Sequence, residues 1–162
     1  MDFDDFYREH YSLVRRAMLL TFRDPSLADD VTQEAFYKAL RRWTKVSQLD
    51  RPDAWTMVVA LNDGRDSARR RRRHEAKARL LSPRGTTGSA EQDVADRMFV
   101  AELLESVTDR QREVLVLRYM TQMTVPEIAR VLHCAEGTVK STLHSALQKA
   151  SQLAKGPEYV DD

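Results

Sequence analysis

Apolar residues recur every three or four positions through most of the chain, a pattern that predicts amphipathic helices rather than strands. In the first 22 residues they form one stripe, made of Phe3, Phe6, Tyr7, Tyr11, Val14, Met18 and Phe22. A second stripe comprises Leu27, Val31, Ala35, Leu40 and Trp43. We expect this second helix to begin with Asp24 as its N-cap and Pro25 at its first helical position.

A third helix is expected to start near Pro52, after a break over residues 44–53. Its inward residues are expected to be Trp55, Val58, Val59, Asn62 and Asp66. Continuing this series places Arg69 and Arg73 nearest the bundle, and leaves Arg70, Arg71 and Arg72 facing solvent. The three helices together predict a small bundle.

The second half of the chain follows a stretch without apolar periodicity, SPRGTTGSAEQD at residues 82–93, which reads as a linker. Helical periodicity returns between Val94 and Val107. Two capping-box spacings, Thr108 with Gln111 and Thr124 with Glu127, mark further helix starts. The expected fold class is all-α, with two small helical domains joined by a flexible linker.

The last two helices have the pattern of a helix-turn-helix, although an ordinary helical hairpin would also fit. Ala129 lies near the middle of the first helix and must be small because the second helix crosses close to it. A turn at His133–Ala135 leads into a helix whose apolar residues are Val139, Leu143 and Leu147. Its outward residues would meet base edges and phosphates in the major groove: Glu136, Thr138, Lys140, Ser141 and His144.

Charge is divided unevenly along a chain whose formal net charge is only +1. Residues 65–79 carry eight Lys and Arg against two acidic residues, whereas residues 1–34 carry eight Asp and Glu against four Arg. Two surfaces of opposite sign predict two different partners. Five consecutive Arg residues, 69–73, sweep about 400° of a helix, so we expect two or three of them to contact phosphate. The alternative interpretation of these five arginines is a nuclear-targeting tract.

The composition narrows the class of protein. No apolar run approaches the roughly 18 residues of a membrane span, and the start, MDFDDFYREH, is acidic where a signal peptide would be basic. The single cysteine, Cys134, excludes an internal disulfide. We therefore expect an intracellular protein. Cys134 itself is expected to be a buried structural thiol, with a redox sensor as the alternative.

No enzyme chemistry is indicated. The four histidines, His10, His74, His133 and His144, are far apart, with no carboxylate or cysteine at metal-ligand spacing. The five glycines are isolated and make no phosphate-binding loop. We expect a non-enzyme without cofactor or metal.

Two parts of the chain resemble one known family. The block LLESVTDRQREVLVLRYMTQMTVPEIARVLHCAEGTVKSTLHSAL resembles region 4 of the ECF (extracytoplasmic-function) sigma factors of bacterial RNA polymerase. ADDVTQEAFYKAL and PDAWTMVVALNDGRDSARRRRR resemble the parts of their region 2 that bind polymerase and melt the promoter −10 element. Response-regulator output domains share a similar helix-turn-helix, so it is the two regions in order that carry the resemblance.

The resemblance implies three sets of site residues. Core polymerase would contact Asp29, Asp30, Gln33 and Glu34. Single-stranded −10 DNA would contact Lys45, Ser47, Gln48, Asp50, Asn62, Arg65, Arg69, Arg70, Arg72 and Arg73. Duplex −35 DNA would contact Glu136, Thr138, Lys140, Ser141, Thr142 and His144.

Some of these residues could instead have a purely structural role. Asp29 and Asp30 would also complement the helix dipole. Trp43 and Trp55 fit stacking on bases, but their spacing favours the core.

The resemblance also implies an organisation and a function. Residues 1–80 would form region 2, 81–96 a linker, 97–155 region 4 and 156–162 a short acidic tail. Such a protein directs promoter-specific initiation and is cytoplasmic, associated with the nucleoid when in holoenzyme. A stand-alone helix-turn-helix regulator and a protein-binding adaptor are the alternatives, and an anti-sigma factor is a partner that the sequence leaves open.

The turn and the last helix depart from the family pattern. The turn reads His133-Cys134-Ala135, where the family often has Gly-apolar-Ser, so it lacks both the glycine suited to a left-handed turn and the N-cap serine. Thr142, Ser145 and Leu147 or Gln148 stand where arginines are common. We therefore expect weaker −35 binding, with Leu147 enlarging an apolar surface for a protein partner.

Overall fold

The computed structural model describes residues 1–77 and 94–156. Within these ranges it contains eight helices and no strands, which confirms the all-α fold. The chain divides into two compact units, Met1–Arg79 with Val116–Thr124 and Leu80–Leu115 with Val125–Asp162. None of the described helices is long and apolar enough to span a membrane.

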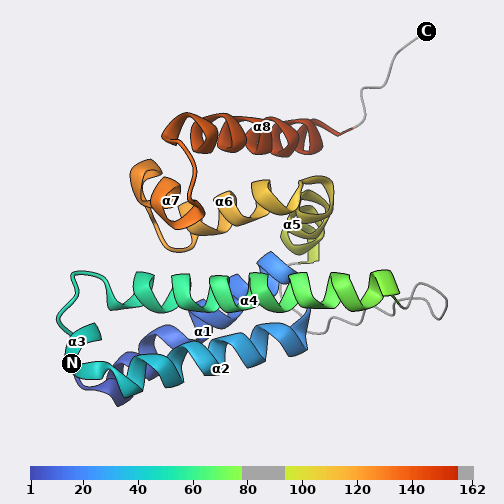
Figure 1. Ribbon diagram of the computed structural model, residues 1–162. Helices are drawn as coiled ribbons and strands as arrows, with labels where there is room; N and C mark the ends of the chain where they lie inside the picture. The colour runs from blue at the N-terminus through green and yellow to red at the C-terminus, as the bar shows by residue number, and fades with distance from the viewer. Residues whose placement is uncertain (78–93, 157–162) are drawn as a thin grey trace, which may run out of the picture. The chain divides into compact units, whose positions relative to one another are not determined.

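The N-terminal helices α1 (Phe3–Phe22), α2 (Pro25–Arg41) and α4 (Pro52–Lys77) lie side by side as a three-helix bundle, with the single turn α3 (Trp43–Val46) between α2 and α4 (Figure 1). The predicted start of α2 is confirmed, because the carboxylate of Asp24 accepts a hydrogen bond from the Leu27 N–H at 3.0 Å. Pro25 occupies the first turn, where its missing N–H costs nothing.

The core of the bundle follows the predicted stripes of α1 and α2 closely. Phe6, Val14 and Met18 from α1 are buried against Leu27, Val31 and Ala35 from α2. Leu40 was expected inside but is 50% exposed, and its neighbour Ala39 is buried instead. A helix that keeps its period of 3.6 residues moves from Ala35 to Ala39, so the larger side chain of Leu40 points outward.

Trp43 is half-buried and packs on the aromatic residues of α1. Its ring lies 5.4 Å from the ring of Phe3 and 4.9 Å from that of Phe6, measured between centroids. Such tilted and edge-on contacts stabilise aromatic clusters beyond their buried area. The core interpretation is therefore the one that the structure supports for this tryptophan.

The inward face predicted for α4 is wrong. The buried residues are Thr56, Met57, Ala60, Leu61 and Gly64, whereas Asn62 and Asp66 are exposed. Both series repeat every three or four residues, and Trp55, Val58 and Val59 of the predicted series are half-buried. The small residues Ala60 and Gly64 face inward because the backbone of α4 lies close to its neighbours.

The C-terminal helices are α5 (Val94–Ser106), α6 (Asp109–Tyr119), α7 (Val125–Leu132) and α8 (Glu136–Lys155). The first predicted capping box is confirmed at α6. The Thr108 N–H donates to Gln111 Oε1 at 3.0 Å, and the Gln111 N–H donates to Thr108 Oγ1 at 3.2 Å. α7 begins directly after Thr124, where the second box predicts a helix start.

Arg112 joins α5 to α6 from a buried position. Its guanidinium donates to the Leu104 carbonyl from both Nε (3.2 Å) and Nη2 (2.6 Å), and to the Val107 carbonyl at 3.4 Å. Leu104 lies in the last turn of α5 and Val107 follows directly after it, where backbone carbonyls lack partners along the helix itself. Arg112 thus acts as a side-chain cap that no periodicity argument would find.

The predicted linker lies mostly outside the described residues. Of residues 81–96, only Val94–Asp96 are described, and they form the first turn of α5 rather than a linker. The predicted tail is described only at Gly156, which follows α8 as its C-cap.

Candidate functional site

The helix-turn-helix is present as predicted. α7 ends in a Schellman motif, in which the Cys134 N–H donates to the Ala129 carbonyl at 3.0 Å and the His133 N–H to the Arg130 carbonyl at 3.4 Å. His133 adopts the left-handed conformation at φ 51° that glycine prefers. Ala129 is buried, as expected of a small residue at the crossing of α7 and α8.

The N-terminus of α8 lacks a side-chain cap, as the sequence indicated. Ala135 has the extended N-cap conformation at φ −71° and ψ 149° but makes no side-chain hydrogen bond. Its carbonyl accepts from the N–H groups of Thr138 (3.0 Å) and Val139 (3.2 Å). Cys134 in this turn is half-buried rather than buried.

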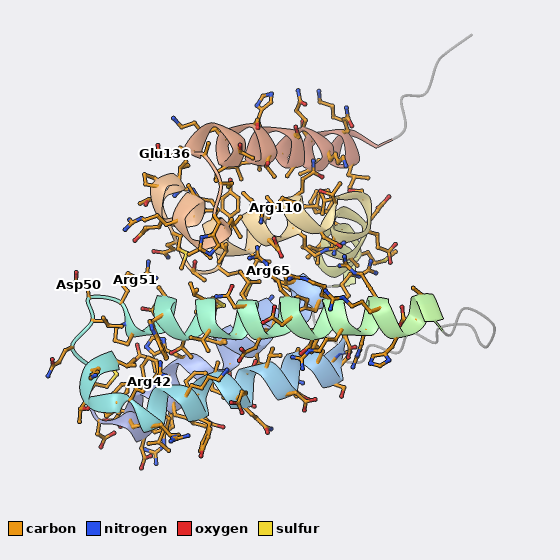
Figure 2. All side chains as sticks on the ribbon, viewed as in Figure 1. Arg42, Asp50, Arg51, Arg65, Arg110 and Glu136 are labelled. Atoms are coloured by element: carbon orange, nitrogen blue, oxygen red, sulfur yellow. The ribbon has the colours of Figure 1, made fainter. Side chains whose placement is uncertain are left out.

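The predicted −35 residues share the outward face of α8. Glu136, Thr138, Lys140, Ser141 and His144 are exposed, and Thr142 is half-buried. Figure 2 shows Glu136 at the N-terminal end of this helix. Val139 and Ala146 are buried on the other side, whereas Leu147 is 42% exposed and does not continue the predicted inward stripe. A helix presented in this way can lie in the major groove.

The predicted base-reading segment is exposed and lies partly in α3. Lys45, Ser47, Gln48 and Asp50 are exposed, and only Val46 between them is buried. Asp50 and Arg51 lie in the turn between α3 and α4 (Figure 2). The Asp53 carboxylate accepts from Arg51 Nη2 at 2.7 Å. Burial alone would raise the pKa of Asp53, but Arg51 and the Ala54 N–H outweigh it and lower the pKa.

The outward face of α4 carries a mixed polar and basic row. Asn62, Asp66, Arg69 and Arg73 are all exposed, and their spacing of four, three and four residues places them on one side of the helix. Arg70 also reaches this side, where Asp66, Arg69, Arg70 and Arg73 line a shallow hollow of about 200 Å³. We call Asn62, Asp66, Arg69 and Arg73 the outer row.

The prediction that Arg69 and Arg73 lie nearest the bundle is therefore wrong, because both are exposed. Arg71 is exposed, as predicted. It is Arg71 that reaches the bundle, because its Nη1 donates to Asp24 Oδ2. The error follows directly from the inverted inward series of α4, since Arg71 continues the line of Ala60 and Gly64. Arg65 is half-buried, and Arg72 is exposed.

The predicted polymerase-binding residues divide between two sides of α2. Asp30 and Glu34 are exposed one turn apart, and they border a hollow of about 610 Å³ between α2 and α4. Asp29 instead accepts a hydrogen bond from Arg15 Nε, which raises the pKa of Arg15. Gln33 is exposed. The structure thus brings together Asp30 and Glu34, but ties Asp29 to α1.

Sequence reasoning missed three residues at this hollow. Lys38 Nζ donates to both carboxylate oxygens of Asp63, at 2.9 and 2.7 Å, and lies 3.9 Å from Glu34 Oε1. Arg71 also lines the hollow. Lys38 follows Glu34 by four residues, a spacing that could have indicated the pair. Its bond to Asp63 joins residues 25 positions apart, and periodicity gives no signal for that.

Models of known protein families match both halves of the chain. Residues 6–74 match the model "Sigma-70 region 2", and residues 100–149 match "Sigma-70, region 4". The "RNA polymerase sigma-E factor" of Streptomyces avermitilis is 32% identical over 149 residues, covering 92% of this chain and 83% of that protein. The "ECF RNA polymerase sigma factor SigL" of Mycobacterium tuberculosis is 32% identical over 146 residues, covering 88% and 82%.

Solved structures share the fold. The sigma factor RpoE of Bartonella quintana, in complex with the anti-sigma factor NepR, superposes with a TM-score of 0.81 at 19% identity, covering 97% of this chain and 99% of that one. CnrH, in complex with the cytosolic domain of CnrY, gives a TM-score of 0.61 at 28% identity, covering 96% and 89%. With both regions matched in order, and relatives of this identity matched over most of their length, the chain belongs to the ECF group of the sigma-70 family and is a transcription initiation factor.

Proposed function

We propose that this chain binds core RNA polymerase in the cytoplasm and directs it to promoters by contacting a −35 and a −10 element and opening the −10 DNA. Region 2, residues 1–80, would hold polymerase and the −10 element. Region 4, residues 97–155, would read the −35 element. The observation that carries the proposal is that two surfaces of different chemistry lie on one bundle, the acidic pair of α2 and the outer row of α4.

The acidic pair is suited to a basic protein surface. Asp30 and Glu34 are both exposed, and neither is needed for the core of the bundle. Charge complementarity of this kind sets the rate and register of association. Asp29 is assigned a smaller part, because Arg15 already occupies its carboxylate.

The outer row and the exposed stretch that begins in α3, residues 45–50, which we call the α3 segment, are suited to single-stranded DNA. Arg69 and Arg73 offer guanidinium groups to phosphate, which positions the strand. Asn62, with Gln48 and Ser47 of the α3 segment, offers amide and hydroxyl groups that can read the edge of a flipped base. Arg65, Arg70 and Arg72 are further candidates for phosphate contact. This division makes base preference and phosphate binding separable by mutation.

The face of α8 is suited to duplex DNA, but its basic charge is low. Lys140 is the cation among the predicted −35 residues, and Lys149 farther along α8 already donates to the Ser106 carbonyl at 3.0 Å. Phosphate contacts supply most of the salt-dependent affinity for DNA. We therefore propose that region 4 binds weakly alone, and that Leu147 adds an apolar contact to a protein partner such as an anti-sigma factor.

Association with polymerase tests the proposal against its two rivals. Tagged full-length chain is mixed with bacterial core polymerase, and copurification is compared with binding to duplex DNA by the chain alone. A sigma factor copurifies with polymerase and binds promoter DNA tightly only in its presence. Tight duplex binding without polymerase would indicate a stand-alone regulator, and binding to neither would indicate an adaptor.

A further inference from the structure

The carboxylate of Asp24 serves two helices at once. Its Oδ1 accepts from the Leu27 N–H at 3.0 Å and caps α2, while its Oδ2 accepts from Arg71 of α4. Burial alone would raise the pKa of Asp24, but the Leu27 N–H and Arg71 outweigh it and lower the pKa. One side chain therefore connects the start of α2 to the middle of the arginine run, 47 residues later.

Arg71 lies midway between Arg69 and Arg73 in the arginine run, so its bond to Asp24 affects where those two residues face. Residues two apart on a helix point about 200° away from each other, so Arg71 faces nearly opposite to Arg69 and Arg73. When Arg71 is held on Asp24, Arg69 and Arg73 are turned outward, where both are exposed beside Asp66. Like charges four residues apart, such as Arg69 and Arg73, also repel and weaken a helix. An acidic partner on the inner side offsets part of that repulsion.

We propose that Arg71 is a positioning residue, whose ion pair with Asp24 holds the last turns of α4 so that Arg69 and Arg73 face the promoter backbone. This inference rests on the proposed function of the outer row. It assigns to one arginine of the run a role that differs in kind from phosphate contact.

The chain offers variants that separate these roles. Asp24→Asn keeps the N-cap, because asparagine caps as well as aspartate, but removes the ion pair. Arg71→Gln removes the pair from the other side, and Arg71→Lys keeps a cation there. Arg69→Gln and Arg73→Gln are the reference variants for loss of a phosphate contact. Each full-length protein is assembled with core polymerase and titrated at several salt concentrations with one promoter fragment, isolated by run-off transcription of genomic DNA. Thermal unfolding of each variant is recorded in parallel.

The expected result is that Asp24→Asn and Arg71→Gln weaken promoter binding equally, by about two- to fivefold, the range open to an exposed ion pair. The double variant should be no weaker than either single variant, since both remove one interaction. Both should keep the wild-type slope of log K against log salt, and Arg71→Lys should retain most of the affinity. Arg69→Gln and Arg73→Gln should each reduce the slope by about 0.7 to 0.9.

The sign of the Asp24→Asn effect is decisive. Removing a negative charge beside a basic surface strengthens DNA binding if only net charge matters, whereas the inference requires weaker binding. Unchanged or tighter binding by Asp24→Asn, with a reduced slope for Arg71→Gln, would mean that Arg71 contacts phosphate directly. If Arg69→Gln and Arg73→Gln kept the wild-type slope, the proposed role of the outer row would fail, and the inference with it.

Discussion

The packing of α4 depends on Gly64, which has no side chain. A Cβ added to Gly64 would lie 2.2 Å from Cε2 of Phe22, so the ring occupies the space that any larger residue would need. In the sequence this glycine is an isolated helix-weakening residue, and nothing in its surroundings identifies the partner. The contact explains why a residue without a side chain stands on the inward face of α4 at position 64, beside the larger buried residues Met57 and Leu61.

Substitution of Gly64 by alanine should destabilise the bundle, although alanine favours helix formation. We expect the free energy of unfolding to fall by about 1 to 2 kcal/mol, because the Phe22 ring must move. Gly137→Ala is the matched control, since nothing lies within 4 Å of its added Cβ, and it should be neutral or stabilising by up to about 1 kcal/mol. Urea unfolding of both variants measures the difference. Equal effects would mean that Phe22 does not pack on Gly64.

Single residues show which features could be predicted from the sequence and which could not. Asp24 and Pro25 marked the start of α2 because capping is a local interaction. Asn62 and Asp66 were misplaced because two apolar series compete along α4, and only tertiary contacts choose between them. The same inversion misplaced Arg69 and Arg73, and it gave no sign of the bond from Arg71 to Asp24. Ion pairs between distant residues, such as Lys38 with Asp63, leave no local signal at all.

The turn between α7 and α8 departs from the family pattern, and this departure destabilises the start of α8. His133 holds a left-handed conformation that costs a non-glycine residue about 1 to 2 kcal/mol. Ala135 holds the N-cap position without a capping side chain. Both features were visible in the sequence, because helix ends are read from residue type and position.

Ala135→Ser should stabilise the C-terminal helices by about 1 kcal/mol, because its hydroxyl can accept from an unpaired N–H of the first turn of α8. Ala154→Ser, on the exposed side of the same helix, should instead be neutral or slightly destabilising. Thermal unfolding of the two variants tests this. A gain from Ala154→Ser equal to that from Ala135→Ser would argue against a capping effect.

The acidic pair of α2 gives the element-scale prediction about function. Reversing both Asp30 and Glu34 to Lys should abolish association with core polymerase and leave the helical content near wild type, since both side chains are exposed. The Glu9→Lys, Glu102→Lys double variant makes the same charge change at other exposed positions and should still bind. Copurification and circular dichroism compare them. Unchanged polymerase affinity in the Asp30→Lys, Glu34→Lys variant would show that this face of α2 does not bind core polymerase.

For the whole molecule, the proposed function requires the two regions to reach two promoter elements at once. With Val94–Asp96 in α5, the linker is limited to residues 82–93, the stretch without apolar periodicity, rather than the 81–96 that the resemblance implied. Twelve residues extend at most about 40 Å at 3.3 to 3.6 Å each, still more than the roughly 34 Å of one DNA turn.

Deleting residues 85–90 should therefore shift or narrow the preferred distance between the −35 and −10 elements and reduce transcription. Promoters whose spacing is varied one base pair at a time provide the measurement. A variant with an equal number of Gly and Ser residues in place of 85–90 is the control and should behave as wild type. Unchanged spacing preference in the deletion would show that these residues do not act as a spacer.

Transcript mapping is the sharpest test of whether the chain directs promoter-specific initiation. Core polymerase, with and without the full-length chain, transcribes supercoiled genomic libraries, and the start sites are sequenced. We expect a discrete set of start sites that appears only with the chain and shares upstream elements near −35 and −10. If the chain bound core polymerase but the start sites were identical to those of core polymerase alone, the chain would not direct promoter-specific initiation.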